Sequence, residues 1–580
     1  MILKNRQIEP NENIFRQEGY HHYIARYQGD VQGEFENYPD YHINVVNDSY
    51  VTLSLPDTLE NLLPSIANLN TIVYIRPYDI YTLQQISPLE ASQAIFLQQD
   101  LPLSLRGNGV VIGLIDTGID YLNENFMDEN GNTRIDYIWD QGTDLNYDNS
   151  RYELFAPFGR VYGRDEIQEA INLKRNGGDP YSIVPFQDTI GHGTNMAGII
   201  GARDITDGIR GIVPECRFIV IKLTEDISFK DYYKQKIDIP IFNVTQIFLA
   251  LESLYRYSRE VYIPMVFYLP LGTNSGSHNG SNILERYIDT LCFSSGIAIV
   301  TGTGNERNQG SHASGFFTRD MPVRTVSLDV SPEQTALIVE VWIDVPNIAS
   351  IDVISPSGEN SGVINYIVAN IFNYNFLFEK TSIEVLYVIP EATSGAQLIR
   401  ILFTDLSPGI WSIRILGNLI EDGRFNLWIP QRGLTVGGTR FSPADPYGTI
   451  TSPGNSRFII TAAAYNQNNN NIVDFSGMAF LSGYANVIDV AAGGVNALTI
   501  APNNETAIVS GTSVSAAIVA GACAMLFQWS LLQGTAKNIH SQTLKSYLSR
   551  GVTTRPGDVY PNPQWGYGIL NILTMFSNMP

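Results

Sequence analysis

Long apolar runs alternate with amphipathic stretches through much of the chain. Four of these runs are continuous, which is typical of strands buried on both faces of a parallel sheet. They cover residues 110–120, 216–223, 262–272 and 296–308. Stretches with helical spacing lie between them, at 243–258 and 281–296. This alternation predicts an α/β body in which helices flank a parallel sheet.

The pattern changes between residues 317 and 435. Short strands with alternating polar and apolar residues follow one another there, separated by Pro, Gly, Ser and Asn turns and with almost no helical spacing. This predicts an all-β sandwich inserted into the α/β body. The body resumes at residue 436, with strands expected at 457–465 and 486–494.

The first 84 residues have a third pattern. Strands are expected at 21–29, 49–56 and 71–83 and a helix at 56–69, which together make a small α+β unit. The chain is therefore expected to contain an N-terminal domain, an α/β domain in two parts, and an inserted β domain. The N-terminal domain is expected at 1–84, the α/β domain at 85–316 and 436–580, and the inserted β domain at 317–435.

Charge and cysteine content narrow the function classes. The chain has 36 Lys and Arg against 58 Asp and Glu, and the net charge of −22 argues against nucleic acid or an anionic membrane surface as a partner. Three cysteines lie far apart in apolar stretches, so we expect buried thiols and no disulfide framework. The apolar run 516–534 approaches membrane-spanning length, but we interpret it as a core helix, with no membrane insertion. The N-terminus lacks the apolar run of a secretory signal, so we expect synthesis in the cytoplasm without export by the general route.

Four polar residues stand at the ends of predicted elements. Asp116 ends a buried strand, and His192 lies between two glycines just before a helix. Asn305 follows TGTG, and Ser513 precedes a long apolar helix. Taken alone, each has an ordinary structural explanation as a turn residue, a structural histidine or a helix cap. Together they supply a nucleophile, a base, a group that orients the base, and an oxyanion donor.

The sequences around these residues resemble a known family. IDTGID with Asp116, GHGTNMAG with His192, TGTGNE with Asn305 and SGTSVSAAIVAG with Ser513 are similar to the four sequence blocks of the subtilisin-like serine proteases, in that family's chain order. The resemblance covers 85–316 and 436–580 and implies peptide-bond hydrolysis. Ser513 would be the nucleophile, His192 its general base and then acid, and Asp116 the carboxylate that orients the imidazole. Asn305 would donate to the oxyanion together with the backbone N–H of Ser513.

The resemblance also implies two substrate-binding segments, one of which pairs with extended substrate as a strand. They contain Leu271, Gly272 and Thr273, and Gly302, Thr303 and Gly304. The chain departs from the family at Pro270, where serine is usual, at Ala517 and Ile518, where proline and histidine are usual, and at Asn195, where a second histidine is common. We therefore expect the family's chemistry but not its usual specificity.

Residues 1–84 occupy the place of the family's propeptide, which is an intramolecular chaperone and inhibitor. Aligning SPLEASQAI with the mature start of such enzymes predicts autocleavage after Gln84 or Gln85. No cofactor and no metal site are expected from the sequence, although the resemblance leaves a structural calcium ion open.

Among subfamilies, the chain looks most like the clostridial Csp germination proteases. The features that carry this resemblance are the missing signal peptide, the few cysteines, the DYIWDQG stretch and the β insertion before the serine block. The resemblance implies a spore-associated enzyme that activates the precursor of a cortex-lytic hydrolase. The propeptide would stay bound non-covalently after cleavage, and the insertion would be a jelly-roll-like brace.

Three alternatives remain open on the sequence. A pseudoprotease could keep this fold and bind a signal or a partner without catalysis. A transpeptidase of the same family would form the same acyl-enzyme but transfer it to an amine. The β insertion could also be a carbohydrate- or partner-binding module carried by the protease.

Overall fold

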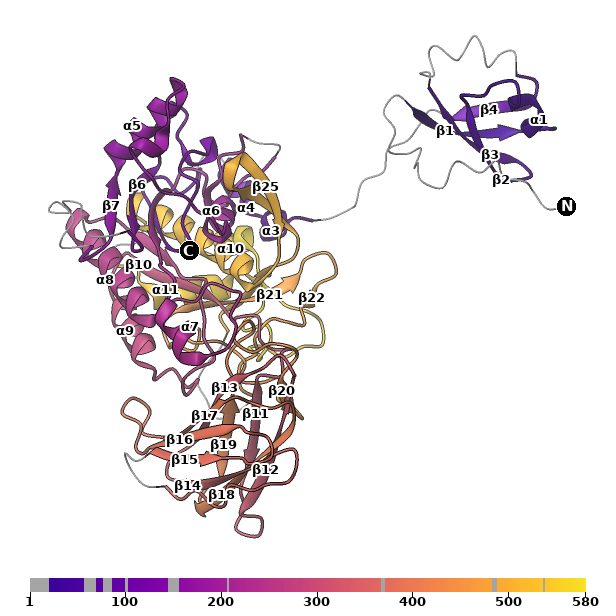
Figure 1. The fold of residues 1–580 in the computed structure, drawn as a ribbon. Coiled ribbons are helices and arrows are strands. Elements are labelled where there is room, and N and C mark those ends of the chain that lie inside the picture. Colours follow the sequence, from indigo (N-terminus) through magenta and orange to yellow (C-terminus); the bar gives the residue numbers. More distant parts are fainter. Residues whose placement is uncertain are drawn as a thin grey trace. The chain divides into compact units, whose positions relative to one another are not determined.

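The computed structural model describes most of the chain. The described residues are 20–56, 69–76, 86–99, 103–143, 156–205, 208–366, 371–481, 488–535 and 538–579. The chain divides into two compact units, residues 1–85 and residues 86–580 (Figure 1).

The first unit contains an antiparallel sheet with strand order β2-β3-β1-β4. Its elements are β1 (His21–Tyr27), α1 (Val31–Phe35), β2 (His42–Asn47), β3 (Tyr50–Leu55) and β4 (Ile72–Arg76). Tyr23, Ala25, Val51 and Leu53 alternate along β1 and β3 and form the core with α1. Strand β2 escaped the sequence analysis because none of its residues is fully buried and its pattern is not alternating. Residues 57–68 of the expected helix and 77–83 of the expected last strand lie outside the described residues.

A long sheet runs through the second unit and confirms the predicted α/β fold. Its central strands have the order β23-β21-β10-β9-β5-β8-β6, and every neighbouring pair among them is parallel. The sequence VIGLID of β5 is buried at every position, which explains its continuous apolar run. The bounds are β5 (Val111–Asp116), β6 (Ile135–Asp140), β8 (Arg217–Lys222), β9 (Met265–Tyr268), β10 (Ile297–Gly302), β21 (Ile460–Asn466) and β23 (Val490–Gly493).

Short antiparallel strands extend this sheet. They are β7 (Arg160–Gly163) beside β6, β22 (Asn471–Ile472) beside β21, and β26 (Val552–Thr553) beside β27 (Ile569–Leu570). A separate hairpin of β24 (Ala497–Ala501) and β25 (Glu505–Val509) precedes the Ser513 helix.

Helices cover both faces of the sheet (Figure 1). The helices α6 (His192–Gly201) and α10 (Thr512–Phe527) pack on one face, and α8 (Val244–Val261) and α9 (Ile283–Cys292) pack on the other. The remaining helices are α3 (Pro88–Ser92), α4 (Ala94–Gln99), α5 (Arg164–Arg175), α7 (Ile227–Tyr233), α11 (Ser541–Arg550) and α12 (Ile572–Ser577).

The helix α10 continues as a π-helix over Gln528–Leu532. The combined helix Thr512–Leu532 is long and apolar enough to cross a membrane, but 89% of its apolar window is buried inside the protein. It lies in the largest hydrophobic core, where it packs against the sheet and beside α6. Its first turn, which carries Ser513, is therefore held by the most buried helix of the described chain.

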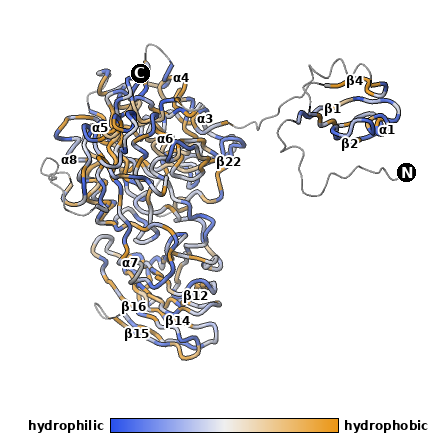
Figure 2. Tube along the Cα trace, turned by 45° about the horizontal axis from the view of Figure 1, so that its top comes forward, coloured by the Kyte–Doolittle hydropathy of each residue, from blue (hydrophilic) through white to orange (hydrophobic). Residues whose placement is uncertain are grey.

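The β domain consists of two antiparallel sheets that share one core. One sheet has the order β11-β19-β13-β17-β16-β15 and the other β14-β18-β12-β20. Buried and partly exposed residues alternate along β16 and β17, and hydrophobic and hydrophilic positions alternate in this region of Figure 2. The bounds are β11 (His312–Phe316), β12 (Val323–Val330), β13 (Ala336–Ile343), β14 (Ile348–Ile354), β15 (Ile371–Asn375), β16 (Ser382–Val388), β17 (Gln397–Thr404), β18 (Gly409–Leu419), β19 (Arg424–Trp428) and β20 (Arg440–Ser442).

The two sheets reach beyond the expected range of 317–435. Strand β11 pairs with β19 on one side, and β20 pairs with β12 on the other. Both additions are short strands next to the α/β body, where glycine and serine interrupt the alternation of polar and apolar residues.

A stack of three buried rings joins the β domain to the α/β body. The indole of Trp428 lies between the imidazoles of His278 and His312, with ring centroids 4.2 and 4.7 Å away. His278 belongs to the loop after β9, whereas His312 and Trp428 belong to β11 and β19. The contact fixes the end of the β domain near the loop after β9, which carries Pro270 and Leu271.

Candidate active site

Asp116 is the last residue of β5, at the carboxyl edge of the parallel sheet. Functional side chains gather at this edge in open α/β sheets. The carboxylate is buried, with the residue 1% exposed, and it accepts a hydrogen bond of 2.7 Å from the backbone N–H of Thr117. The strand therefore holds a fixed, buried carboxylate at the carboxyl edge of the sheet.

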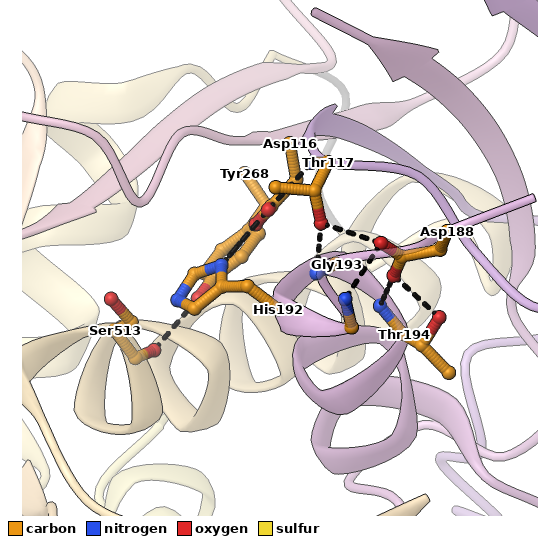
Figure 3. A network of polar contacts seen from close by, with 9 residues as sticks. Asp116, Thr117, Asp188, His192, Gly193, Thr194, Tyr268 and Ser513 are labelled. Atoms are coloured by element: carbon orange, nitrogen blue, oxygen red, sulfur yellow. Dashed lines mark hydrogen bonds and ion pairs between the residues drawn. The ribbon is translucent and has the colours of Figure 1, made fainter. Parts of the chain in front are cut away.

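His192 is the first residue of α6 and faces this carboxylate. Its Nδ1 lies 2.9 Å from both carboxylate oxygens of Asp116 (Figure 3). The approach requires glycine next to the histidine, because a Cβ on Gly193 would lie 2.1 Å from the carbonyl oxygen of Gly118. With Nδ1–H donating to Asp116, the Nε2 of the neutral ring carries the lone pair and can accept a proton.

A second carboxylate holds the start of α6 in position. Asp188 accepts hydrogen bonds from the backbone N–H of Gly191 (2.8 Å) and Thr194 (2.9 Å), and from the hydroxyl of Thr117 (2.9 Å). The same Thr117 hydroxyl accepts from the N–H of Gly193 at 2.9 Å, so the loop after β5 and the start of α6 share one network (Figure 3). The sequence analysis missed Asp188, although an acid just before a helix is a recognisable capping signal.

The charges around His192 favour its protonated form. Partial burial alone would lower the pKa of the imidazole, but the charge and hydrogen bond of Asp116 and the charge of Asp188 outweigh that effect. The pKa of His192 is therefore raised above its ordinary value of 6.5. A base of this kind accepts a proton readily and is stabilised as the imidazolium.

Ser513 lies in the first turn of α10, next to the imidazole. Figure 3 shows the second ring nitrogen of His192 directed toward the Ser513 side chain. Tyr268, the last residue of β9, is fully buried and donates a hydrogen bond of 2.8 Å to the carbonyl oxygen of Ser513. This bond ties the serine backbone to the sheet, and no sequence signal had indicated it.

Asn305 follows β10 and lies beside the start of α10. Its side-chain oxygen accepts from the backbone N–H of Thr512 at 3.1 Å and from the Thr512 hydroxyl at 3.2 Å. A Cβ on Gly302 would lie 2.7 Å from the carbonyl oxygen of Thr512, so glycine is required for this approach. Since the oxygen is occupied by Thr512, the amide N–H groups of Asn305 are left to donate elsewhere.

A cavity of about 140 Å³ opens beside Ser513 and Asn305. Of the six residues expected to bind substrate, Leu271, Gly272, Gly302 and Gly304 line it. Thr303 instead is fully buried, and its hydroxyl contacts that of Ser476 at 3.1 Å. Thr273 exchanges backbone hydrogen bonds with Ser452, so this part of its backbone is occupied within the chain. The remaining lining residues are Pro270, Thr301, Glu306, Gln431, Thr451 and Thr512.

The arrangement is suited to acyl transfer. A hydroxyl next to the free nitrogen of an imidazole can attack a carbonyl while the ring takes its proton. Asn305 and the first turn of α10 border the same cavity, and amide donors at such a place can stabilise the negative charge that develops in acyl transfer. Among the described residues, no group of three or more His, Cys, Asp or Glu side chains could hold a metal ion.

A parallel sheet with an aspartate, a histidine and a serine at its carboxyl edge defines a serine protease of the subtilisin-like class. A model of the subtilase family (peptidase S8) matches residues 107–316 and 444–568, and the chain belongs to this family. It is a subtilisin-like serine protease. The matched segments leave out most of the β domain.

One solved structure supports this assignment. The CspB protease of Clostridium perfringens is 30% identical, with a TM-score of 0.74, and the match covers 84% of this chain and 96% of that protein. A cold-adapted subtilisin-like serine proteinase is 12% identical with a TM-score of 0.37, covering 80% of this chain and 89% of that protein. No curated protein sequence gives a significant match. The similarity to CspB reaches into the β domain, because the residues outside that domain are too few to make up the 84% of this chain that the match covers.

Proposed function

We propose that Ser513, His192 and Asp116 form the catalytic triad, with Asn305 as a donor to the oxyanion. The observation that carries this proposal is the 2.9 Å contact between His192 Nδ1 and both oxygens of Asp116, on the helix that faces Ser513. Ser513 attacks the scissile carbonyl, and His192 takes the hydroxyl proton and returns it to the leaving amine. Water then releases the acyl group by the same route.

We also propose that the protein cuts its own chain after Gln84 or Gln85. Both residues lie outside the described part of the chain. The proposal is supported by the division into two compact units, since the first unit ends at residue 85. After cleavage, residues 1–84 would stay bound non-covalently and act as the inhibitor.

N-terminal sequencing of purified protein tests this step. The parent is expected to yield a new N-terminus at residue 85 or 86, whereas Ser513→Ala stays intact. Equal cleavage of Ser513→Ala would show that another protease makes the cut. Gel filtration of the cleaved parent is expected to keep both fragments in one peak, and separate elution would contradict non-covalent retention.

We propose limited proteolysis of a cortex-lytic hydrolase precursor during spore germination as the biological role. The support is the sequence resemblance to the Csp germination proteases and the similarity to the CspB protease of Clostridium perfringens. In this role the enzyme is associated with the spore, and the β domain acts as a jelly-roll-like brace for the α/β body.

Incubation of the purified enzyme with such a precursor tests the role. One cut at a defined bond, with a gain of cortex-lytic activity, is expected for the parent and not for Ser513→Ala. Degradation to many fragments, or a precursor left intact by an enzyme that processes itself, would contradict it.

A further inference from the structure

The cavity beside Ser513 is completed by a residue from outside the family-matched segments. Gln431 follows β19 and lies in the stretch between residues 316 and 444 that the family model does not match. It lines the cavity together with Glu306, which follows Asn305. The β domain therefore supplies one of the polar groups next to the proposed nucleophile.

Contacts with the loop after β9 of the α/β body fix the direction of the Gln431 amide. Its side-chain oxygen accepts from the backbone N–H of Asn274 at 3.3 Å and from the Thr273 hydroxyl at 3.5 Å. Within the described part of the chain, its NH₂ group has no protein partner. Since the oxygen is engaged by the body, the NH₂ group is the hydrogen-bonding group that Gln431 offers to the cavity.

Glu306 supplies the opposite kind of group. Glu306 is only 5% exposed. Its carboxylate oxygens accept hydrogen bonds from the backbone N–H of Arg432 at 3.2 and 3.3 Å and from the Asn274 side-chain amide at 3.4 Å. Burial raises the pKa of this carboxyl to about 7. The contacts are long and leave acceptor capacity on the carboxyl group.

We propose that this cavity selects a primary amide side chain, that of glutamine, at the residue just before the scissile bond, with Gln431 as the specificity-determining residue. The proposal rests on the proposed role of Ser513 as nucleophile. A glutamine oxygen accepts from the NH₂ group of Gln431, while its own NH₂ group donates to Glu306. Both polar groups, the NH₂ of Gln431 and the buried carboxyl of Glu306, are then paired with the substrate.

Other side chains satisfy only one of the two groups. Lysine pairs with Glu306 but brings further N–H donors to Gln431. Glutamate pairs with Gln431 but meets a second carboxyl at Glu306. An apolar side chain leaves both groups unpaired, and rejection of such misfits is how polar cavities discriminate. The proposed self-cleavage junction agrees with this preference, because Gln84 and Gln85 are the candidate residues before the cut.

A series of peptide coumarin amides tests the proposal. The series is acetyl-Tyr-Thr-Leu-Xaa-aminomethylcoumarin, which follows residues 81–83, with Gln, Lys, Glu or Met at Xaa. For the parent, kcat/KM is expected to be about 10- to 100-fold higher for Gln than for the other three. Gln431→Glu keeps an acceptor for Asn274 but removes the donor, so it is expected to shift the preference from Gln to Lys by a similar factor. Gln431→Leu is expected to favour Met.

Gln542→Glu, the same change on the exposed surface of α11, is the matched control and should keep the parent profile. Labelling of Ser513 by a fluorophosphonate separates the two proposals. A parent that labels at Ser513 but prefers Lys or Met, or Gln431 variants that label and keep the parent profile, would overturn the glutamine pocket alone. A parent that does not label would overturn the triad. If a Gln431 variant fails to fold, the kcat/KM values of the parent for the four peptides still test whether the cavity prefers glutamine.

Discussion

The histidine of the active site and the two histidines of the domain junction have pKa values that are shifted in opposite directions. His192 is partly exposed and faces two carboxylates, and its pKa is raised above 6.5. His278 and His312 are buried against Trp428, and burial lowers both pKa values, that of His278 to about 4. The same side chain is thus prepared for proton transfer in one region and kept neutral in the other.

Their partners explain the difference. The Nδ1 of His192 has a buried carboxylate as its partner, and its Nε2 faces Ser513. Nε2 of His278 lies 2.9 Å from the carbonyl oxygen of Asn274, and Nδ1 lies 2.8 Å from that of Ile450 and 3.5 Å from the amide nitrogen of Asn455. A ring nitrogen that faces a hydroxyl beside a cavity is typical of a catalytic histidine, whereas two nitrogens that both contact interior groups are typical of a structural one. Six substitutions, one of them a matched control, test this distinction.

Replacing His192 should have the largest effect. His192→Ala removes the proposed base and is expected to lower kcat on the order of 10⁶-fold, as loss of a triad base does. Its thermal transition should change little, because the ring is partly exposed. Steady-state kinetics and calorimetry check both outcomes. Retained activity would show that His192 is not the base.

Asp116→Asn should be the next most severe change. It removes the charge that orients and stabilises the imidazole, so kcat is expected to fall about 10⁴-fold. In the parent, kcat/KM should rise with pH through an apparent pKa above 6.5, because only the neutral base is active. This limb should move to lower pH in Asp116→Asn. An unchanged pH profile would argue against Asp116 as the source of the raised pKa.

Asn305→Ala should have an intermediate effect. The variant loses the proposed side-chain donor to the oxyanion, so kcat is expected to fall about 10²- to 10³-fold with little change in KM. By contrast, Asn426, whose side-chain oxygen lies 3.1 Å from His312 Nε2, serves the interior of the β domain. Asn426→Ala should lower stability and leave the kcat of the folded enzyme close to that of the parent. An equal fall in kcat in Asn305→Ala and Asn426→Ala would contradict a special role for Asn305 in catalysis.

His278→Ala should act on stability. Loss of a buried, stacked ring is expected to lower the free energy of unfolding by about 2 to 4 kcal/mol at pH 7.5. The unfolded ring binds a proton near pH 6.5 and the folded ring only near pH 4, so acid favours unfolding within this window. The parent should therefore lose about 3 kcal/mol through His278 as the pH falls across it. His278→Ala should lack this part of the acid sensitivity in melting curves, and an unchanged dependence on pH would contradict the assignment.

Tyr268→Phe should have the smallest effect. It removes only the hydroxyl that donates to the Ser513 carbonyl, in a residue that is otherwise buried. We expect kcat to fall about 3- to 10-fold with KM unchanged, because one neutral hydrogen bond contributes about 1 kcal/mol. A change in KM alone would indicate that the ring shapes the substrate cavity instead of positioning the serine.

The sequence predicts what depends on short motifs and on periodicity. Asp116, His192, Asn305 and Ser513 stand in recognisable blocks, and the structure brings them to one edge of the sheet. Tyr268 and Gln431 act through contacts with residues more than 150 positions away in the chain, and no local pattern reports such contacts. The family resemblance names Thr303 among the substrate-binding residues, but it does not report that this side chain is buried, with its hydroxyl against Ser476.

Secondary structure follows the same rule. The buried strands were predicted because their apolar runs are continuous. The sequence does not predict strand β6, because IDYIWD contains two aspartates, which are buried in the fold. Asp136 pairs with Arg217 and Arg164, and Asp140 pairs with Lys222. Because the basic partners of these aspartates are distant in the chain, the local sequence of β6 has the polar composition of a loop.

Labelling by a fluorophosphonate, read by peptide mass spectrometry, tests the central claim most directly. The parent should gain one adduct on Ser513, at a rate that rises with pH through a midpoint above 6.5 as His192 loses its proton. His192→Ala should label at a negligible rate. An adduct absent from Ser513, or formed equally fast in His192→Ala, would contradict the account.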